Sequence, residues 1–502
     1  MAEAPSPLSY GRRVAALAAE HPEAVALVFA PLEGQDRPVT WQELEAGSNQ
    51  LARLLDRAGA RESSLVAVAL PNSPEHVACC LAAWKLGACV LPLRHDLPGW
   101  EQERLLAVAG PSLVVGQAPH RGPGAFLAAS ELGAAAGLDD SSLPERVPDP
   151  AMAIATSGSS GAAKLIVAAE RGEWEPDARP GATAEYMGAR PHQVQLVPAP
   201  LYHTNGFKIA FSSLFSDDTV VLMERFEAGR AVELIERYRV STVTMVPTML
   251  QRIARLPGIG GRDLSSLESV LQGGAPCPEW LARAWIELVG PTRFFCAYGS
   301  SERVGLAIIR GDEWLRRPGS VGRPADAEVR ILGPDGRVLG PGQVGEIFMR
   351  PLEPGPRFSY RGGDRPRVSE DGFVSVGDLG WLDPDGYLYV ADRRADMIVT
   401  GGANVYPAEV EAALSEHPEV ADVVVVGVAD PEWGRRVHAL VQPRRPDRPP
   451  SPAELVGHCR QRLAAYKVPK SVQLVDRLPR NEAGKLNRGA IAAAVEAARP
   501  PG

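Results

Sequence analysis

Several features that would assign a chain to a special class are scarce in this sequence. Only 6 of its 502 residues are cysteine, and their spacing matches no metal-ligand motif. So few thiols in a long chain exclude a disulfide-stapled secreted scaffold, and they fit buried apolar side chains in a reducing compartment. They are Cys79, Cys80, Cys89, Cys277, Cys296 and Cys459.

An excess of positive charge and long apolar runs are also missing. The formal net charge is −8, which gives no electrostatic reason to bind nucleic acid or an anionic membrane. No run approaches the ~18 apolar residues of a membrane-spanning helix. The first residues, MAEAPSPLSYGRR, lack the apolar core of a signal peptide. We therefore expect a cytoplasmic protein with no nucleic-acid partner and no membrane span.

What is present is the composition of a globular protein with more than one domain. A chain of 502 residues is too long for one core. Over the first ~340 residues, amphipathic helical patterns alternate with short apolar strands, which predicts an α/β fold with packed, largely parallel sheets. Ligands in such folds bind beyond the carboxyl ends of the strands. The turns at 198–200 and 273–276 fall at such ends.

The pattern changes after Gln343. Stretches such as FVSVGDLGWLDPDGYLYV predict β-hairpins, with Asp385 and Gly386 forming one of the turns. From about Asp396, short helices and strands follow one another over about one hundred residues, which is enough for a separate small α+β domain.

One short segment, ATSGSSGAAKLIV, suggests a phosphate-binding loop. It fails the pattern G-x-x-x-x-G-K-[ST], because Gly158 and Gly161 are three residues apart and Leu165 follows Lys164. It still combines glycines that allow close backbone approach with several hydroxyls and one mobile positive charge. A flexible Ser/Gly linker is the alternative, and this segment by itself does not decide between them.

Four further segments contain groups suited to a nucleotide, although each also has an ordinary structural explanation as a turn, a joint or a solvated charge. They are YGSSE at 298–302, GDLGWLDPDG at 377–386, DRRADMIVTGGANVYPAEVE at 392–411 and LPRNEAGKLNRGAI at 478–491. With PLYH at 200–203 and GGAP at 273–276, they occur in a fixed order along the chain. With its motifs in this order, the sequence strongly resembles the adenylate-forming superfamily from about Thr40 to Arg488. The resemblance argues against the interpretation of ATSGSSGAAKLIV as a flexible linker.

The resemblance implies an acid–thiol ligase with a large N-terminal domain of packed β-sheets flanked by helices and a small mobile C-terminal domain. Such enzymes activate a carboxylic acid with ATP and Mg²⁺, release pyrophosphate and transfer the acyl group from AMP to a thiol, commonly that of CoA. The implied division is 1–392 for adenylation, 393–395 for the hinge and 396–502 for the mobile domain. The resemblance is compatible with a homodimer as well as with a monomer.

Nucleotide-binding roles follow from the resemblance residue by residue. The β- and γ-phosphates are assigned to a loop of Thr156, Ser157, Gly158, Ser159, Ser160, Gly161 and Lys164. The adenine is assigned to Gly274, Ala275, Pro276 and Tyr298, with Gly299 and Ser300 beside it. Ser301 is expected to donate to the α-phosphate, and Glu302 to bind Mg²⁺, a hard cation that prefers oxygen ligands. Asp378 and Arg393 are expected to hold the ribose hydroxyls.

Catalysis and acyl transfer are assigned in the same way. Lys485 matches the catalytic lysine of the mobile domain, where a positive charge is needed between the attacking carboxylate and the α-phosphate. His203 is expected beside the acyl-AMP as a gate. The hinge is placed at Ala395, and rotation about it would bring a CoA tunnel into use. The tunnel is assigned to Gly401 and Gly402, and the acyl pocket to His203, Phe207, Val246 and Gln272.

Two positions depart from the family pattern. Leu165 replaces a glycine after the loop lysine, which reduces backbone freedom, and Ala395 replaces a charged hinge residue. The segment SGSSGAAKLIV also resembles the loop of bile-acid–CoA ligases and of synthetases that activate polycyclic acids of platensimycin-type diterpenoids. It therefore suggests a bulky polycyclic acid.

Three functions stay open from the sequence. The first is an acyl-CoA synthetase, and the second is a stand-alone adenylating enzyme that delivers its acyl group to a carrier protein or a separate enzyme. The third is a degenerate acyl-adenylate-binding protein, against which Glu302, Asp378, Arg393 and Lys485 argue. Formation of a CoA thioester separates the first two.

Overall fold

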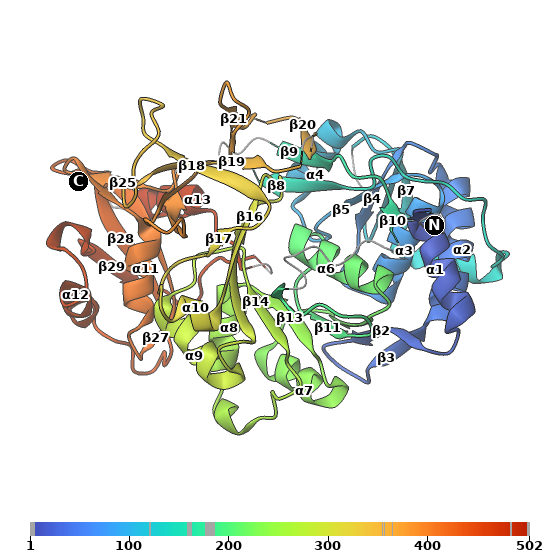
Figure 1. The fold of residues 1–502 in the computed structure, drawn as a ribbon, viewed down its shortest axis with the longest axis horizontal. Coiled ribbons are helices and arrows are strands. Elements are labelled where there is room, and N and C mark those ends of the chain that lie inside the picture. Colours follow the sequence, from blue (N-terminus) through green and yellow to red (C-terminus); the bar gives the residue numbers. More distant parts are fainter. Residues whose placement is uncertain are drawn as a thin grey trace.

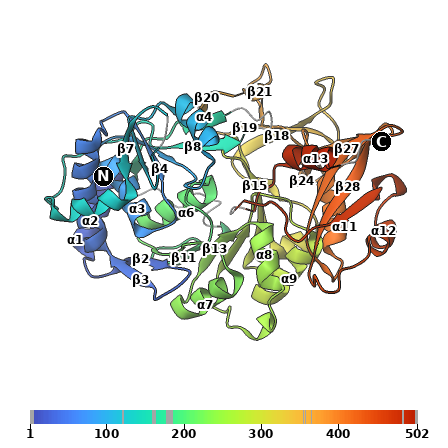
Figure 2. The same cartoon turned by 180° about the vertical axis from the view of Figure 1, so that it is seen from behind.

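The structure, a computed structural model, describes residues 6–119, 122–157, 163–175, 186–353, 355, 357–363, 365–481 and 484–498. Figures 1 and 2 show the C-terminal segments, coloured orange and red, gathered at one end of the molecule, and the blue N-terminal segments at the other end. Within the described residues, no helix combines the length and apolar character needed to cross a membrane.

The largest sheet in the described chain has nine strands in the order β17-β16-β15-β14-β13-β11-β12-β2-β3. Its six strands from β15 to β2 run parallel, and the strands at both edges are antiparallel. In chain order the strands are β2 (Val25–Ala30), β3 (Arg37–Thr40), β11 (Val194–Val197), β12 (Thr219–Met223), β13 (Thr242–Met245), β14 (Ser269–Gln272), β15 (Phe294–Gly299), β16 (Leu306–Arg310) and β17 (Arg323–Pro324). One face packs against α7 (Ala228–Tyr238), α8 (Pro247–Ala254) and α9 (Glu279–Val289).

A second, parallel sheet of four strands has the order β5-β4-β6-β7. The strands are β4 (Leu65–Ala69), β5 (Cys89–Pro92), β6 (Leu113–Gly116) and β7 (Ala125–Ala128). All of β4 is buried, as expected for an uninterrupted apolar strand covered on both faces. The core between the two sheets contains α1 (Tyr10–Glu20), α2 (Trp41–Ala58), α3 (Pro74–Lys85) and α6 (Thr204–Phe215), while α4 (Gly99–Ala109) packs on the outer face.

The start of α2 shows how local sequence fixes an element. The Thr40 hydroxyl accepts from the Glu43 backbone N–H at 3.2 Å, and the Glu43 carboxylate accepts from the Thr40 backbone N–H at 2.8 Å. This reciprocal capping box satisfies two backbone donors that the helix leaves unpaired. The helix ends at Gly59, whose φ of 114° suits a residue without Cβ.

Antiparallel strands join the two ends of the molecule (Figure 1). One sheet contains β18 (Ala327–Leu332), β19 (Gly345–Pro351), β21 (Arg367–Val368), β22 (Val374–Ser375), β23 (Asp378–Leu382) and β24 (Leu388–Arg393). A three-stranded sheet contains β8 (Ala153–Ser157), β9 (Ala163–Ala168) and β20 (Phe358–Arg361). Elsewhere, β1 (Leu8–Ser9) pairs with β10 (Glu173–Trp174), and α10 (Gly311–Trp314) packs in the core of the nine-stranded sheet.

The last sheet is built entirely from residues after 397 and packs on two hydrophobic cores of its own. Its strands are β25 (Ile398–Thr400), β26 (Ala403–Val405), β27 (Val420–Asp430), β28 (Gly434–Pro443) and β29 (Ser471–Leu474). The helices are α11 (Pro407–Ser415), α12 (Pro452–Arg460) and α13 (Arg488–Ala497). The predicted fold class, a large α/β domain of packed sheets with a small C-terminal α+β domain, is confirmed.

Candidate active site

The predicted adenine-binding residues lie where β14 ends. Gly274, Ala275 and Pro276 follow the strand directly and are exposed, so their backbone is open to a ligand. Gln272, predicted for the acyl pocket, is buried, and its side-chain amide donates to the Ala275 carbonyl at 2.7 Å. That hydrogen bond holds the turn of residues 273–276 against the end of β14. Gly274 has a φ of 83°, and a Cβ there would lie 3.4 Å from Val246.

Tyr298 and the two predicted ribose residues form one connected group. The Tyr298 hydroxyl donates to Asp378 Oδ2 at 2.7 Å, and Arg393 Nε lies 3.6 Å from Asp378 Oδ1. Asp378 and Arg393 face each other across the antiparallel pair β23–β24. Burial raises the pKa of Asp378, and the Arg393 charge opposes that shift. The group offers a carboxylate acceptor and a guanidinium donor at neighbouring positions, which suits a diol.

Glu302 is the buried carboxylate of a second group. Lys164 Nζ lies 3.5 Å from Glu302 Oε1, and the Tyr360 hydroxyl donates to the same oxygen at 2.6 Å. Lys164 Nζ also lies 3.6 Å from the centre of the Tyr360 ring. The predicted phosphate lysine and the predicted Mg²⁺ ligand are therefore adjacent, although β9 and the turn after β15 are far apart in sequence.

The surroundings of Glu302 fit Mg²⁺ better than a cation whose ligands must all come from protein side chains. The described residues contain no group of three His, Cys, Asp or Glu side chains able to hold a metal ion. Mg²⁺ is commonly bound by one or two carboxylates together with substrate phosphates and water. A single carboxylate beside a lysine is compatible with a magnesium ion that arrives with a nucleotide.

Hydroxyls gather next to Glu302. Ser301 Oγ lies 2.8 Å from the Oγ1 of Thr204, the first residue of α6. The Ser300 hydroxyl is buried and has no hydrogen-bond partner within the described part of the chain. Gly299, at the end of β15, is exposed. These groups leave hydrogen-bonding capacity for a ligand between β15 and α6.

His203 precedes α6 and is held as a neutral imidazole. Its Nε2 is buried and finds no partner among the residues that the structure describes. Burial, together with the positive charges of Lys485 and Arg94, lowers the His203 pKa to about 3. A neutral ring with an unused nitrogen suits the predicted gate beside a reacting carboxyl group.

Lys485 reaches this group from the C-terminal domain. Burial and the nearby Arg393 charge lower its pKa, while Glu302 raises it. The preceding Gly484 lies so close to α8 that a Cβ there would be 2.4 Å from Thr248 Oγ1 and 3.5 Å from Val246. The domain orientation therefore brings Lys485 together with Glu302, Arg393 and His203.

Other predicted residues lie elsewhere or outside the described chain. Phe207 is only 2% exposed and packs in the core, 5.7 Å from the Trp84 ring centre. Ala395 is exposed in a turn, where the Asp396 N–H donates to the Arg393 carbonyl at 3.0 Å. Gly401 and Gly402 form an exposed turn between β25 and β26.

The predicted phosphate loop is described only at its ends. Thr156 and Ser157 end β8, and Lys164 lies in β9 opposite Thr156. Gly158, Ser159, Ser160 and Gly161 lie outside the described residues.

Sequence reasoning missed Tyr360 and Thr204. Tyr360 lies on β20, which pairs with β9, so a strand about 200 residues downstream supplies a hydroxyl to Glu302. A lone tyrosine between RFS and RGG carries no motif. Thr204 stood next to the predicted His203, but its contact with Ser301 depends on how α6 faces β15.

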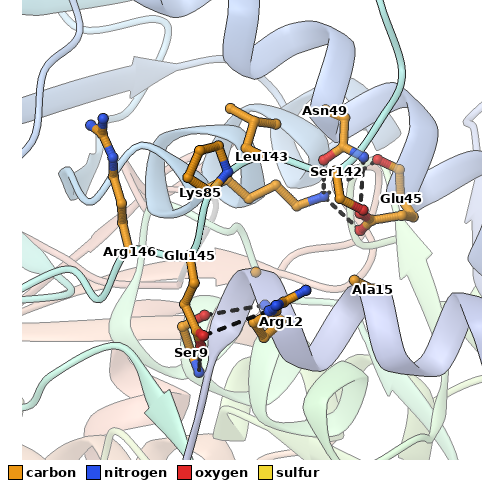
Figure 3. Close-up of a pocket in the computed structure, with 12 residues that line it drawn as sticks. Ser9, Arg12, Ala15, Glu45, Asn49, Lys85, Ser142, Leu143, Glu145 and Arg146 are labelled. Carbon is orange, nitrogen blue, oxygen red and sulfur yellow. Dashed lines mark hydrogen bonds and ion pairs between the residues drawn. The ribbon is translucent and has the colours of Figure 1, made fainter.

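A pocket in the N-terminal region has a structural explanation (Figure 3). Its volume is about 20 Å³, which is close to the space of one water molecule. Within it, Lys85 Nζ contacts Glu45 at 2.6 Å, Asn49 at 2.7 Å and Ser48 at 2.8 Å. The charge of this buried lysine is fully satisfied, and no predicted site residue lines the pocket.

Comparisons with known proteins show the family of the chain. The family model AMP-binding enzyme matches residues 14–352, and AMP-binding enzyme C-terminal domain matches 409–485. A feruloyl-CoA synthase of an Amycolatopsis species is 35% identical over 468 residues, which cover 90% of this chain and 93% of that protein. A fatty acid–[acyl-carrier-protein] ligase of Streptomyces coeruleorubidus is 31% identical over 479 residues, covering 90% and 91%. The structure of Bacillus subtilis o-succinylbenzoate coenzyme A synthetase with ATP and a magnesium ion aligns with a TM-score of 0.81 and 29% identity, covering 96% and 99%.

Proposed function

Because the chain belongs to the AMP-binding enzyme family and is an AMP-forming acid–thiol ligase, we propose that its interdomain site activates a carboxylic acid with a bulky ring body. ATP, Mg²⁺ and CoA are the co-substrates and cofactor of this ligase type. The observation that carries the proposal is the convergence of Lys485 with Glu302 after β15, Arg393 at the end of β24 and His203 before α6.

In the first half-reaction, this chain positions two negatively charged reactants. Asp378 and Arg393 would hold the ribose, Lys164 the outer phosphates, and Ser301 the α-phosphate. Glu302 would hold Mg²⁺, which when bound neutralises phosphate oxygens. A carboxylate oxygen of the substrate then attacks the α-phosphorus, and the bond to the bridging oxygen of the pyrophosphate breaks.

Lys485 serves this step through its charge. The attack forces the carboxylate and the α-phosphate together, and a positive charge placed between them stabilises the transition state. Closing of the site around bound reactants would strengthen the effect, because charges interact more strongly when less water screens them. In the second half-reaction, the thiol attacks the acyl carbonyl and AMP leaves.

The second step requires Lys485 to withdraw, which we assign to rotation of residues 396–502 against 1–392 about the hinge 393–395. The exposed turn at Ala395 and the separate hydrophobic cores of the two parts support this division. Gly401 and Gly402 would then border the CoA tunnel. Both glycines are exposed in the present orientation, and the Gly401 N–H donates to the Trp433 carbonyl at 3.0 Å.

The ring body of the substrate is supported from two directions. The relatives named above act, by their names, on ferulate and o-succinylbenzoate, which are ring acids, and on a fatty acid. The loop resemblance to ligases of polycyclic acids points to a larger ring system. An apolar pocket gains about 0.8 kcal/mol per buried CH₂, so a pocket shaped for a ring body discriminates strongly against small acids.

A panel of acids in ATP–pyrophosphate exchange tests the proposal. We expect kcat/KM for a rigid multi-ring carboxylic acid, ferulate or 2-succinylbenzoate to exceed that for acetate and benzoate. The preferred acid should then yield a thioester with CoA in the same enzyme. Preference for acetate would refute the ring body, and preference for benzoate would refute its bulk. Transfer to a carrier-protein thiol but not to CoA would show that the acyl acceptor is a carrier protein.

A further inference from the structure

Helix α8 touches the C-terminal domain at both of its ends. At its first turn, Thr248 lies against Gly484, the residue before Lys485. At its other end, Arg255 follows the last helical residue and reaches the segment that joins α11 to β27. A short helix thus connects the contact beside the predicted catalytic lysine with a second contact about 10 Å away, since each helical residue adds ~1.5 Å.

Among the described residues, the hydrogen-bond partners of the Arg255 side chain are backbone carbonyls of the other domain. Its Nη1 contacts the carbonyl oxygens of Val420 at 2.7 Å and Ala421 at 2.9 Å, and its Nη2 contacts that of Ser415 at 2.8 Å. Ser415 is the last residue of α11, so the guanidinium also lies at the negative end of that helix. The planar fork of an arginine fits such fixed acceptors, whereas a lysine ammonium does not.

Two neighbours reinforce this contact. Gln251, one turn earlier on α8, donates its side-chain amide to the Ala421 carbonyl at 2.7 Å. Trp280 packs its ring 4.9 Å from the Arg255 guanidinium and donates its indole N–H to Ser415 Oγ at 3.0 Å. Every one of these hydrogen bonds crosses from the N-terminal to the C-terminal domain.

The electrostatics agree with a buried but charged arginine. Burial and the nearby Arg444 charge lower the Arg255 pKa, Asp422 opposes them, and the resulting value is about 10. Arg255 therefore stays protonated at neutral pH, and its hydrogen bonds are charge-assisted.

We propose that Arg255 is a positioning residue that holds the C-terminal domain in the orientation in which Lys485 faces Glu302. The inference rests on the proposed function, because it assigns Arg255 to the first half-reaction only. Rotation of the C-terminal domain would remove all three carbonyl acceptors from Arg255 at once. Adenylation therefore depends on Arg255, and thioester formation from an acyl-adenylate does not.

The test separates the two half-reactions in Arg255→Ala. With the acid selected by the panel, we expect ATP–pyrophosphate exchange to fall about tenfold or more, the scale of losing hydrogen bonds to a charged group. Thioester formation from supplied acyl-AMP should stay at the parent rate or rise. Arg255→Lys should recover little, because it keeps the charge without the fork. Unchanged exchange, or an equal loss in both half-reactions, would overturn the inference.

Matched variants exclude a general loss of structure. Arg252 lies on the same helix and is exposed, so Arg252→Ala should leave exchange unchanged. Gln251→Ala should lower exchange in the same direction as Arg255→Ala but less, and it carries the test if Arg255→Ala unfolds.

A second readout needs no substrate. Trypsin should cut the exposed hinge arginines, Arg393 and Arg394, faster in Arg255→Ala than in Arg252→Ala. Equal cleavage rates would overturn the inference. Failure of the parent enzyme to exchange pyrophosphate with any acid would instead refute the proposed function.

Discussion

At the scale of single residues, each buried carboxylate of the site has a cation and a tyrosine hydroxyl as partners. Glu302 is shared between Lys164 and Tyr360, and Asp378 is shared between Tyr298 and Arg393. These contacts hold both carboxylates beside cations that would stabilise a polyanionic ligand. His203 differs, because the surrounding positive charges and burial keep it neutral.

The neutral state of His203 predicts the pH dependence of adenylation. With a pKa lowered from 6.5 to about 3, the imidazole gains no proton as the pH falls from about 8 to 5.5. His203→Gln should therefore change the level of exchange activity but not the shape of its profile of kcat/KM against pH. If the parent enzyme showed an ionisation near 6.5 that the variant lacked, His203 would titrate and this account of its environment would be wrong.

At the scale of elements, the three strands β8, β9 and β20 explain the first departure from the family pattern. Leu165 is 0% exposed and packs in the core beside Leu91 and Val114, so this position of β9 serves packing as well as the loop. Sequence reasoning treated the residue as loop backbone, because the apolar run after the lysine gave no sign of which sheet it joins.

Truncation of Leu165 should therefore destabilise the protein. Leu165→Ala leaves a cavity in a packed core and should lower the free energy of unfolding by about 2–5 kcal/mol. Urea denaturation measures this, with Val368→Ala as the control, because Val368 is 60% exposed. Similar unfolding midpoints for the two variants would show that packing of Leu165 in the core contributes little to the free energy of unfolding.

The elements also show what a sequence can and cannot provide here. The capping box at Thr40, the parallel strands and the glycine-rich turn after β14 follow from local patterns, and the structure has them. The contacts of Tyr360 with Glu302 and of Arg255 with Ser415 join residues 58 and 160 positions apart. They depend on strand pairing and domain orientation, which local periodicity does not encode.

At the scale of the whole molecule, a short exposed turn links two parts that have separate hydrophobic cores. The Asp396 N–H closes this turn on the Arg393 carbonyl, and Arg394 pairs with Glu346 at 3.1 Å, on the N-terminal side. Ala395 carries no charge, so it forms no ion pair that would favour one orientation of the C-terminal domain. Because a solvated ion pair contributes only about 0–1 kcal/mol, the missing charge is compatible with the proposed rotation.

Substitutions at Ala395 test the pivot. Proline fixes φ near −65° and restricts the residue before it, so Ala395→Pro should abolish thioester formation while retaining ATP–pyrophosphate exchange at a reduced level. Ala395→Asp, the control, should retain both half-reactions. Thioester formation by the proline variant at the parent rate would place the pivot elsewhere.

The two half-reactions of Lys485→Ala test the central claim most directly, because the claim assigns this residue to adenylation alone. ATP–pyrophosphate exchange should fall at least ~10²-fold, the scale of removing one preorganised group from a transition state. Thioester formation from supplied acyl-AMP and CoA should fall much less. An equal loss in both half-reactions would contradict the assignment of Lys485 and the domain rotation that withdraws it.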